Sequence, residues 1–515
     1  MPNRSADIVF QLVHSLEKAE KRNFKLYIKR NSPNDDLKIV ELFDALDKLR
    51  EYDENLLLKK LHSIKKPQLA NVKSHLYKQV LASLRVIKIS ESVDLQLHEQ
   101  LDYARILYHK GLYYQSLKIL EKVKEMAVSF NQDVFLIQPI SLEKKIETLH
   151  ITRSMQNRAE QLSTEADDVH SKRLFITGLS NLALKLYSWY VKHGHARNAT
   201  DEAVVKKYLY DNLPAKHFKL TGFYERLYYY QSFCWYGFIC QDFLKYYRYT
   251  QKWVDLFHEQ PFMIDIETGH YIKGMHNLMN AHFDLRNFKK FELSLEEFTA
   301  FAQSKIAGKH VNNSVQTFVY LMSARINQHL ITGTFSNGLA LIPYTEKKLA
   351  EYHLYLDRHR ILVFNYKIAT LYFGAGNYNK CIDYLRNIIN DVVDLRQDLQ
   401  CYTRLLHLIA HYELGNTDIM EHLIKSVYRF MAKMDNLSVI EEEILKYLQR
   451  SFFMPVKRLQ PEFKKLLEQL KALESNRYET RAFAYLDVVS WLESKVSNEP
   501  LQKVIHDKYL KSSRR

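Results

Sequence analysis

The stretch that most constrains the fold of this chain is residues 365–386, NYKIATLYFGAGNYNKCIDYLR. Apolar residues recur at helical spacing on both sides of Gly376, so the stretch predicts two helices joined by a tight turn. Gly376 suits such a turn because glycine adopts a left-handed backbone without steric cost. Ala369 and Cys381 put one small residue in each helix, which lets the two backbones approach closely. A single helical hairpin cannot cover its own apolar faces, so further hairpins are expected beside it.

A second stretch, residues 101–123, repeats the pattern. Its Ala104 and Ser116 stand where the first stretch has its two small residues, and Gly111 stands at the turn. Weaker copies appear when the turn residue is fixed in each, at intervals of 38 to 47 residues. The predicted turn residues are Gly111, Gln156, Gly194, Gln241, Arg286, Gly333, Gly376 and Gly415.

This pattern resembles the tetratricopeptide repeat, which has small residues at positions 8 and 20, glycine at 15 and tyrosine at 17. The two stretches above match it in full, with Tyr113 and Tyr378 at position 17. The intervals are longer than the ~34 residues of that repeat and fall in the range of other α-solenoids. The resemblance implies an all-α fold: an α-solenoid of about eight antiparallel helical hairpins with helical caps at both ends.

Composition independently favours helices. The chain has 13 glycines and 10 prolines in 515 residues, and sheet proteins of this length need many more such turn residues. The expected regions are an N-terminal helical bundle or cap (1–96), tetratricopeptide-like repeats (97–435) and a C-terminal helical cap (436–515). In the first region we predict helices over 5–30, 39–49, 54–61 and 68–89. In the last, Pro461 is expected to start a helix over 462–473.

Candidate partner-binding residues follow from the resemblance. In tetratricopeptide domains the first helix of each hairpin lines a concave groove, chiefly through positions 2, 5, 9 and 12. The groove residues that this implies are His98, Arg105 and Tyr108 in one copy and Tyr366, Thr370 and Phe373 in the other. The family's clamp for a peptide carboxylate needs lysine at position 5 and asparagine at 9. Because Tyr366 and Thr370 stand there, that clamp is not predicted.

Motifs for catalysis or cofactor binding are not recognisable in the sequence. The glycines of residues 374–376 lie between two helices, so they do not form a phosphate-binding loop after a strand. His407 and His411 share a helix face, but with no third ligand evident we interpret them as partly buried side chains. The aromatic stretch 227–253 is interpreted as hairpin core, with a base-stacking platform or a ligand groove as alternatives. We therefore predict a protein that is not an enzyme and uses no cofactor or metal.

The net charge of +15 leaves a second function open. The predicted helix 68–89 is basic and follows a short turn, an arrangement that permits a helix-turn-helix reader of nucleic acid. Its candidate contacts are Lys73, Lys78 and Arg85. In this alternative the chain is a nucleic-acid-binding regulator, with the repeats as a sensing or dimerising arm. Binding of the first helix to a membrane surface is a further alternative.

Cellular location is predicted from three absences. No apolar run approaches the ~18 residues of a membrane span, Asp7 and Glu17 interrupt the apolar phase that a signal peptide needs, and the four cysteines form no CxxC pair. We therefore expect a cytoplasmic protein with reduced cysteines. The favoured function is a non-enzymatic protein–protein interaction scaffold or adaptor that holds a protein or peptide partner in its concave face. The sequence identifies neither that partner nor the oligomeric state.

Overall fold

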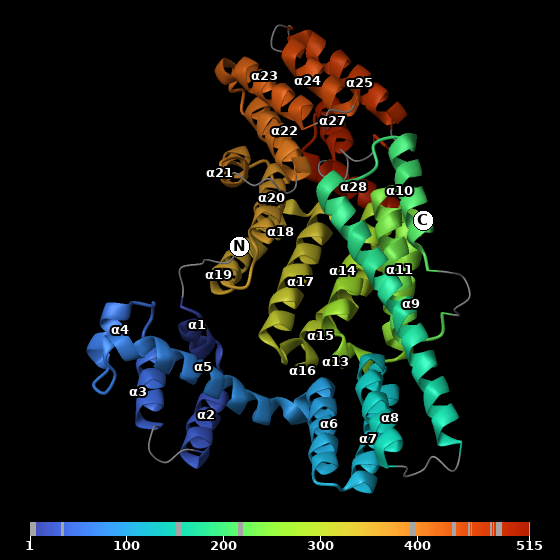
Figure 1. The fold of residues 1–515 in the computed structure, drawn as a ribbon. Helices are drawn as coiled ribbons and strands as arrows, with labels where there is room; N and C mark the ends of the chain where they lie inside the picture. Colours follow the sequence, from blue (N-terminus) through green and yellow to red (C-terminus); the bar gives the residue numbers. More distant parts are fainter. Residues whose placement is uncertain are drawn as a thin grey trace. The chain divides into compact units, whose positions relative to one another are not determined.

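The described part of the chain contains helices and no strands, which confirms the predicted all-α class (Figure 1). The computed structural model describes residues 7–31, 36–150, 157–214, 220–391, 397–434, 439–451, 454, 456–473, 476, 478–479 and 487–513. These residues divide into two compact units, 1–173 and 174–515. The boundary between the units falls within one long helix, α9 (Arg158–His193). The boundaries expected at residues 96 and 435 concern other positions and stay predictions.

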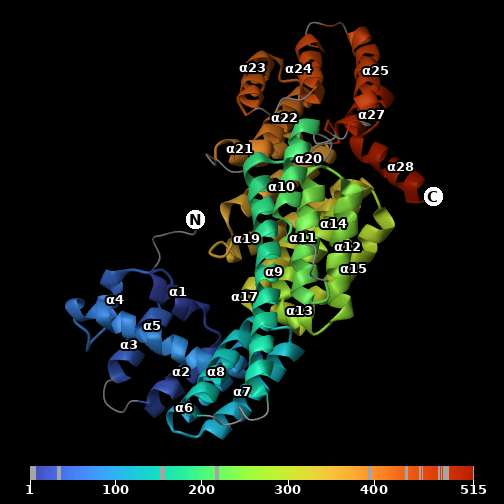
Figure 2. The ribbon, with the colours of Figure 1, turned by 45° about the vertical axis from the view of Figure 1, so that its right-hand side comes forward.

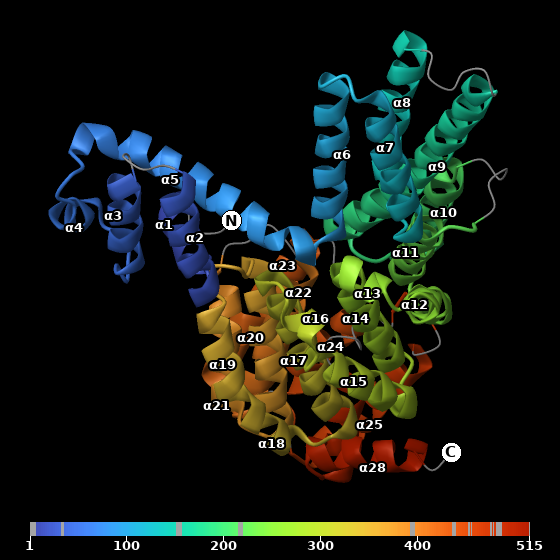
Figure 3. The same ribbon diagram turned by 90° about the horizontal axis from the view of Figure 1, so that it is seen from below.

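Among its described residues, the first unit contains eight α-helices and the beginning of a ninth. They are α1 (Ile8–Ser15), α2 (Lys18–Asn31), α3 (Asp36–Asp47), α4 (Glu54–Lys60), α5 (Lys66–Lys88), α6 (Val93–His109), α7 (Tyr113–Ser129), α8 (Ile137–His150) and α9 (Arg158–His193). In the described residues, 3₁₀ turns at Ile89–Glu91 and Asp133–Leu136 join neighbouring helices. The antiparallel pair α6 and α7 is seen side by side in Figure 3. Three of the four helices predicted in residues 1–96 appear here as α3, α4 and α5.

The remaining prediction for this region, a single helix over residues 5–30, is wrong. The chain leaves the helix at Leu16, which is extended (φ −74°, ψ 137°) and buried. A new helix starts at once, because the Glu17 N–H donates to the Glu20 carboxylate at 2.9 Å. The apolar periodicity continues across this break, so periodicity alone could not reveal it.

The second unit continues with pairs of helices. Its members after α9 are α10 (Ala199–Asn212), α11 (Phe223–Ile239), α12 (Phe243–Glu259), α13 (Met263–Ile266), α14 (Thr268–Asp284), α15 (Phe288–Ala302), α16 (Lys305–Gly308), α17 (Val311–Thr332), α18 (Phe335–Gly338), α19 (Ile342–Glu351), α20 (Arg358–Gly374), α21 (Tyr378–Ile389), α22 (Gln397–Glu413), α23 (Thr417–Lys433), α24 (Val439–Ser451), α25 (Val456–Leu473), α27 (Val488–Ser497) and α28 (Leu501–Ser513), with a 3₁₀ turn at Leu339–Leu341. Figure 2 shows α11, α12, α14 and α15 side by side. In Figure 1, α17 lies between α14 and α20, and it packs against both.

Seven of the eight predicted turn residues have a left-handed backbone, which confirms those turns. Their φ angles lie between 54° and 80°, including the non-glycine residues Gln241 and Arg286 at 54°. Gln156, the eighth, lies outside the described residues. In six of these turns the next N–H donates to the carbonyl five residues back, as from Asn377 to Tyr372 at 2.9 Å. This is the Schellman arrangement, which satisfies the last carbonyls of the first helix.

The residue after the turn often begins the second helix as its cap. Asp242, Asn287 and Asn377 each accept a hydrogen bond from the N–H three residues later, at 3.0, 3.4 and 3.2 Å. Left-handed turn and side-chain cap therefore follow each other directly, which explains how two helices can reverse direction within three residues.

Small residues hold the paired helices close together. The Ser116 hydroxyl donates to the Ala104 carbonyl at 2.7 Å, which joins the two predicted small positions of α6 and α7. In the α11–α12 pair, a Cβ at Gly237 would lie 2.8 Å from the Tyr246 nitrogen. Ala369 and Cys381 are completely buried between α20 and α21. The predicted role of the small residues in close approach is thus seen directly.

The last helix packs against the turns of earlier pairs. The His506 ring bonds the Thr332 carbonyl at 2.8 Å, and Gln502 accepts from the Ser336 hydroxyl at 2.8 Å. A Cβ on Gly333 would collide with the backbone of His506, so only glycine fits between α17 and α28. The Tyr509 ring meets Phe288 edge to face, 5.1 Å between centroids.

Pro461 does not start its helix, contrary to the prediction. It lies inside α25, which begins at Val456. The helix continues through the proline because Phe463, Leu466 and Leu470 are buried in a core shared with α24 and α27. Among the described residues, no helix is both long and apolar enough to cross a lipid bilayer.

Candidate functional site

A hollow of about 400 Å³ opens in the second unit, along the first helices of successive pairs. Most of its lining comes from α11, α14, α17 and α20, with contributions from α9, α12 and α22. We call this space the inner hollow. It combines charged, amide and aromatic side chains from several helices, and this makes it the candidate site.

The centre of the inner hollow holds a lysine between two aromatic faces. Lys273 on α14 places its ammonium 5.7 Å from the ring centroid of Trp235 and 5.2 Å from that of Tyr320. Such cation–π contacts stabilise a partly desolvated cation without neutralising its charge. Burial would raise the pKa of the Tyr320 hydroxyl, but Lys273 and Arg360 beside it bring that pKa below its usual value. Two cations thus lie beside the Tyr320 hydroxyl.

A second lysine reaches the hollow from α20. Lys367 donates from its ammonium to the Asn327 side-chain oxygen on α17. Burial lowers the pKa of Lys367 to about 8, although nearby Asp284 acts in the opposite direction. Burial likewise raises the pKa of Asp284 to about 7. Near neutral pH the lysine is therefore mostly charged, and the carboxyl group is partly protonated.

His276 connects the two sides of the hollow. Its ring stacks on Tyr320 with 4.0 Å between centroids, and its Nε2 lies 3.1 Å from the Asn280 amide nitrogen. The pKa of His276 lies well below its usual value, because of burial and then because of Lys273, Lys367 and Arg360. A neutral imidazole suits this place, since a fourth cation would add to the repulsion among the others.

One half of the predicted groove lies in this hollow. Tyr366 and Thr370 line it. Phe373 does not belong to the lining and is buried in the core that α20 shares with α21 and α22. The face of α20 that lines the hollow therefore includes two of the three residues implied by the repeat pattern. The lining ends at Thr370, one helical turn before Phe373.

The other predicted groove residues lie in the first unit, on α6. His98 is exposed with its ring 4.9 Å from Phe135, and Arg105 is exposed and bonded to Gln138 at 2.7 Å. Tyr108 is half-buried beneath the ammonium of Lys145, 5.0 Å from the ring centroid. These side chains contact neighbouring helices of the same unit, so the two halves of the predicted groove belong to different units.

The candidate nucleic-acid contacts are not gathered on one face of α5. Lys73 is half-buried and pairs at 2.9 Å with Asp7, the residue that caps the N-terminus of α1. Arg85 pairs with Asp102 at 3.1 Å, and Lys78 is exposed. At 3.6 residues per turn, Lys78 and Arg85 share a face while Lys73 points well away from it.

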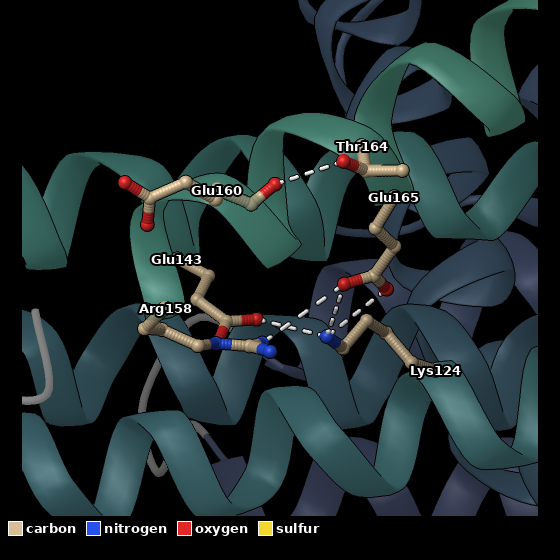
Figure 4. A network of polar contacts seen from close by, with 6 residues as sticks. All are labelled: Lys124, Glu143, Arg158, Glu160, Thr164 and Glu165. Atoms are coloured by element: carbon tan, nitrogen blue, oxygen red, sulfur yellow. Dashed lines mark hydrogen bonds and ion pairs between the residues drawn. The ribbon is translucent and has the colours of Figure 1, made fainter. Parts of the chain in front are cut away.

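The densest ionic network of the first unit also joins helices to one another. Figure 4 shows Lys124 of α7 between Glu143 of α8 and Glu165 of α9, with Arg158 on the other side of Glu143. Glu143 accepts from Lys124 and from the Arg158 Nε, both at 2.9 Å, and is only 2% exposed. Two cations face two carboxylates, so the network is internally balanced and we assign it a structural role.

Histidine pairs do not make a metal centre in the described residues, where no group of three or more potential ligands converges. His407 and His411 contact each other with 4.5 Å between ring centroids. Burial lowers the pKa of His407 to about 4, and His411 bonds the Asn416 side chain at 2.9 Å. They are packed, neutral side chains at the end of α22.

The aromatic stretch 227–253 contributes to both core and hollow. Leu227, Cys234 and Trp253 are fully or almost fully buried, whereas Trp235 faces the hollow. Its lysines lie over tyrosines of the same stretch, as Lys245 does over Tyr236 at 5.0 Å. Core packing thus accounts for most of this stretch, and one edge of it forms a wall of the candidate site.

The charged residues of the hollow were missed by sequence reasoning. Arg360 and Lys367 do not occupy the family's groove positions. Lys273 does stand at position 2 of the copy that turns at Arg286, but no groove residues were predicted for that copy. A signal exists for Lys367 as well. Lys367 is the only charged residue between Ile361 and Asn379, and an isolated lysine in an apolar helix needs a buried partner or a ligand.

The sequence matches no model of a known protein family and no curated protein.

Proposed function

We propose that this chain is a non-enzymatic protein-interaction scaffold that binds a peptide segment of its partner in the inner hollow. In this proposal the helix pairs form an α-solenoid of tetratricopeptide-like hairpins, capped by helices at both ends, and their first helices supply the concave face. The observation that supports it is the hollow itself. It runs across the first helices of four successive pairs, as a groove for an extended ligand requires.

The lining suits a peptide. Asn277, Asn280 and Asn327 place amide groups on α14 and α17, and amides both donate to and accept from a peptide backbone. Trp235 and Tyr190 offer flat apolar surface for side chains. A few polar groups among aromatic walls give orientation together with burial, the usual design of a binding site.

The proposed location is the cytoplasm. Cys234, Cys240, Cys381 and Cys401 are buried and belong to no disulfide. Burial raises the pKa of the Cys234 thiol to about 12, so it remains protonated and unreactive. Cysteines that form no disulfide fit a reducing compartment, where a scaffold would meet its partner.

Selection of binding peptides from a random display library, on the full chain, tests this function. Peptides that bind should fail to bind a Thr370→Trp variant, because the indole would fill the hollow. They should still bind Leu293→Trp, a matched change at an exposed position of α15. If no peptide is selected, or if both variants bind equally well, the proposal is wrong.

The nucleic-acid alternative rests on the basic helices of the first unit. On α2, Lys18, Arg22 and Lys29 have no ion-pair partner in the described residues, but Lys21 and Lys25 pair with Asp47 and Asp44, both at 2.6 Å. Lys73 and Arg85 are likewise engaged. We therefore place this function second, and a gel-shift of the full chain at low salt decides it, since phosphate contacts are strongest there.

A further inference from the structure

The inner hollow contains more positive than negative charge. Lys273, Arg360 and Lys367 line it from α14 and α20, against two carboxylates, Asp284 and Asp357. Asp357 caps α20 and lies 3.5 Å from Arg360, at the exposed edge. Asp284, with a pKa of about 7, carries only part of a charge near neutral pH. Asp284 therefore offsets the charge of Lys367 only in part.

The lysines have only neutral partners in the described structure. Lys273 contacts the faces of Trp235 and Tyr320, and Lys367 donates to the Asn327 amide oxygen. No described carboxylate lies within ion-pairing distance of either ammonium. Half-buried cations of this kind are costly, because they have lost part of their hydration without gaining a counter-charge. A bound anion would supply that charge.

The surroundings are arranged for an anion and against a cation. His276 is held neutral and offers one ring N–H, and the Tyr320 hydroxyl and the Asn280 amide add further donors. Lys273 and Arg360 act on both groups: they bring the pKa of Tyr320 below its usual value, and they add to the effect of burial in lowering the pKa of His276. Positive potential in a low-dielectric hollow strengthens every contact with an anion.

We propose that the inner hollow binds a phosphate group, carried by a phosphorylated side chain of the bound peptide. The inference rests on the proposed peptide-binding function and adds the chemistry of the ligand. A phosphate monoester carries nearly two negative charges and three acceptor oxygens, which match two ammonium groups and a guanidinium on neighbouring helices. A carboxylate carries one charge and would leave part of the positive charge unbalanced.

Phenyl phosphate is the probe for this proposal, because it joins a phosphate to a ring that the aromatic wall accommodates. In calorimetric titrations of the full chain it should bind more tightly than benzoate, its carboxylate counterpart. Lys273→Gln and Arg360→Gln should each weaken phenyl phosphate by about tenfold or more, the usual loss for a charged hydrogen bond. Lys289→Gln, on the exposed face of α15, is the matched control and should leave binding unchanged.

Two results would overturn the phosphate site. One is that phenyl phosphate does not bind at millimolar concentration or binds no better than benzoate. The other is that Lys273→Gln and Lys289→Gln bind equally well. Denaturation curves of both variants show that they are folded before they are compared. If selected peptides depend on the hollow while phenyl phosphate does not bind, only this inference fails. If phenyl phosphate binds but no peptide does, the peptide function fails.

Discussion

The two helix pairs that look most alike in sequence, α6–α7 and α20–α21, differ most in their surroundings. Both turn at a glycine, Gly111 and Gly376, with φ angles of 76° and 80°. Yet α6 presents an exposed face whose Arg105 bonds Asp102 and Gln138. On α20 the residue that matches Arg105 is Thr370, which lines the inner hollow.

The comparison separates what the repeat motif determines from what it leaves free. The motif determines the turn, the close approach of two helices and the small residues between them. It leaves free the residues that meet the next pair. At one position of the repeat, nine residues before the turn glycine, α6 has Asp102 and α20 has Lys367, which carry opposite charges. Binding chemistry is therefore a property of neighbouring pairs, and it cannot be read from one copy.

The largest expected effect concerns a glycine that meets another helix. Gly333→Ala should lower the free energy of unfolding by about 2–5 kcal/mol, because a left-handed alanine is strained and its Cβ meets the backbone of His506. Gly111→Ala should lower it by about 1–2 kcal/mol, since no atom lies within 4 Å of the added Cβ. Urea titrations followed by circular dichroism measure both. Equal losses would show that contact with α28 contributes nothing.

A similar contrast exists just before the turns. A Cβ on Gly374 would overlap the ring of buried Phe335. Gly374→Ala should therefore lower the free energy of unfolding by about 1–3 kcal/mol. His109, at the same place in α6, is exposed, and His109→Ala should leave stability nearly unchanged. Thermal unfolding of the two variants compares them directly. A destabilised His109→Ala beside a neutral Gly374→Ala would contradict the packing described.

The inner hollow also predicts a pH dependence. Burial raises the pKa of Asp284 from 3.8 to about 7, so the folded state retains a proton that the unfolded chain releases. The contribution of Asp284 to stability is present below its unfolded pKa and is lost as pH rises through the folded pKa. As the pH rises from 3.8 to about 7, the free energy of unfolding of Asp284→Asn should therefore increase by about 1–3 kcal/mol relative to that of the parent. Unfolding curves across this window test it, and parallel curves for both proteins would refute it.

The smallest effects on stability are expected when the opposite charges of α6 and α20, Asp102 and Lys367, are removed. Lys367→Met should raise the free energy of unfolding by about 1 kcal/mol while weakening the binding of phenyl phosphate, because it removes a half-buried cation that nearby Asp284 offsets only in part. Asp102→Asn should change stability by less than about 1 kcal/mol, as expected for exposed ion pairs. Denaturation together with calorimetry tests both variants. A strongly destabilised Lys367→Met would mean that the lysine has a structural role.

Much of the local structure could be predicted from the sequence. The register of the copies identified left-handed turns even at Gln241 and Arg286, because turn geometry is encoded within a few residues. The break at Leu16 was missed, since the Glu17–Glu20 contact that starts α2 leaves the apolar period intact. Pro461 misled the prediction, because tertiary packing overrides its preference for a first turn.

The site could be predicted only in part. Tyr366 and Thr370 were expected in a groove and line the hollow, because one face of one helix follows from periodicity. Lys273 and Arg360 were not expected. Lys273 stands at position 2 of the copy that turns at Arg286, for which no groove residues were predicted, and Arg360 lies outside the groove positions. The two cations meet only when α14 and α20 both pack against α17. Such contacts join residues more than 80 positions apart in the chain, a distance over which a single sequence carries no signal.

Photo-crosslinking at the matched positions Thr370 and Arg105 tests the central claim most directly. A benzoylphenylalanine would be placed at each position of the full chain, in cells that naturally produce it. If the inner hollow is the binding surface, Thr370 should yield a discrete covalent adduct with a partner polypeptide and Arg105 should not. Adducts from Arg105 alone would contradict the account, because the partner would then bind the first unit.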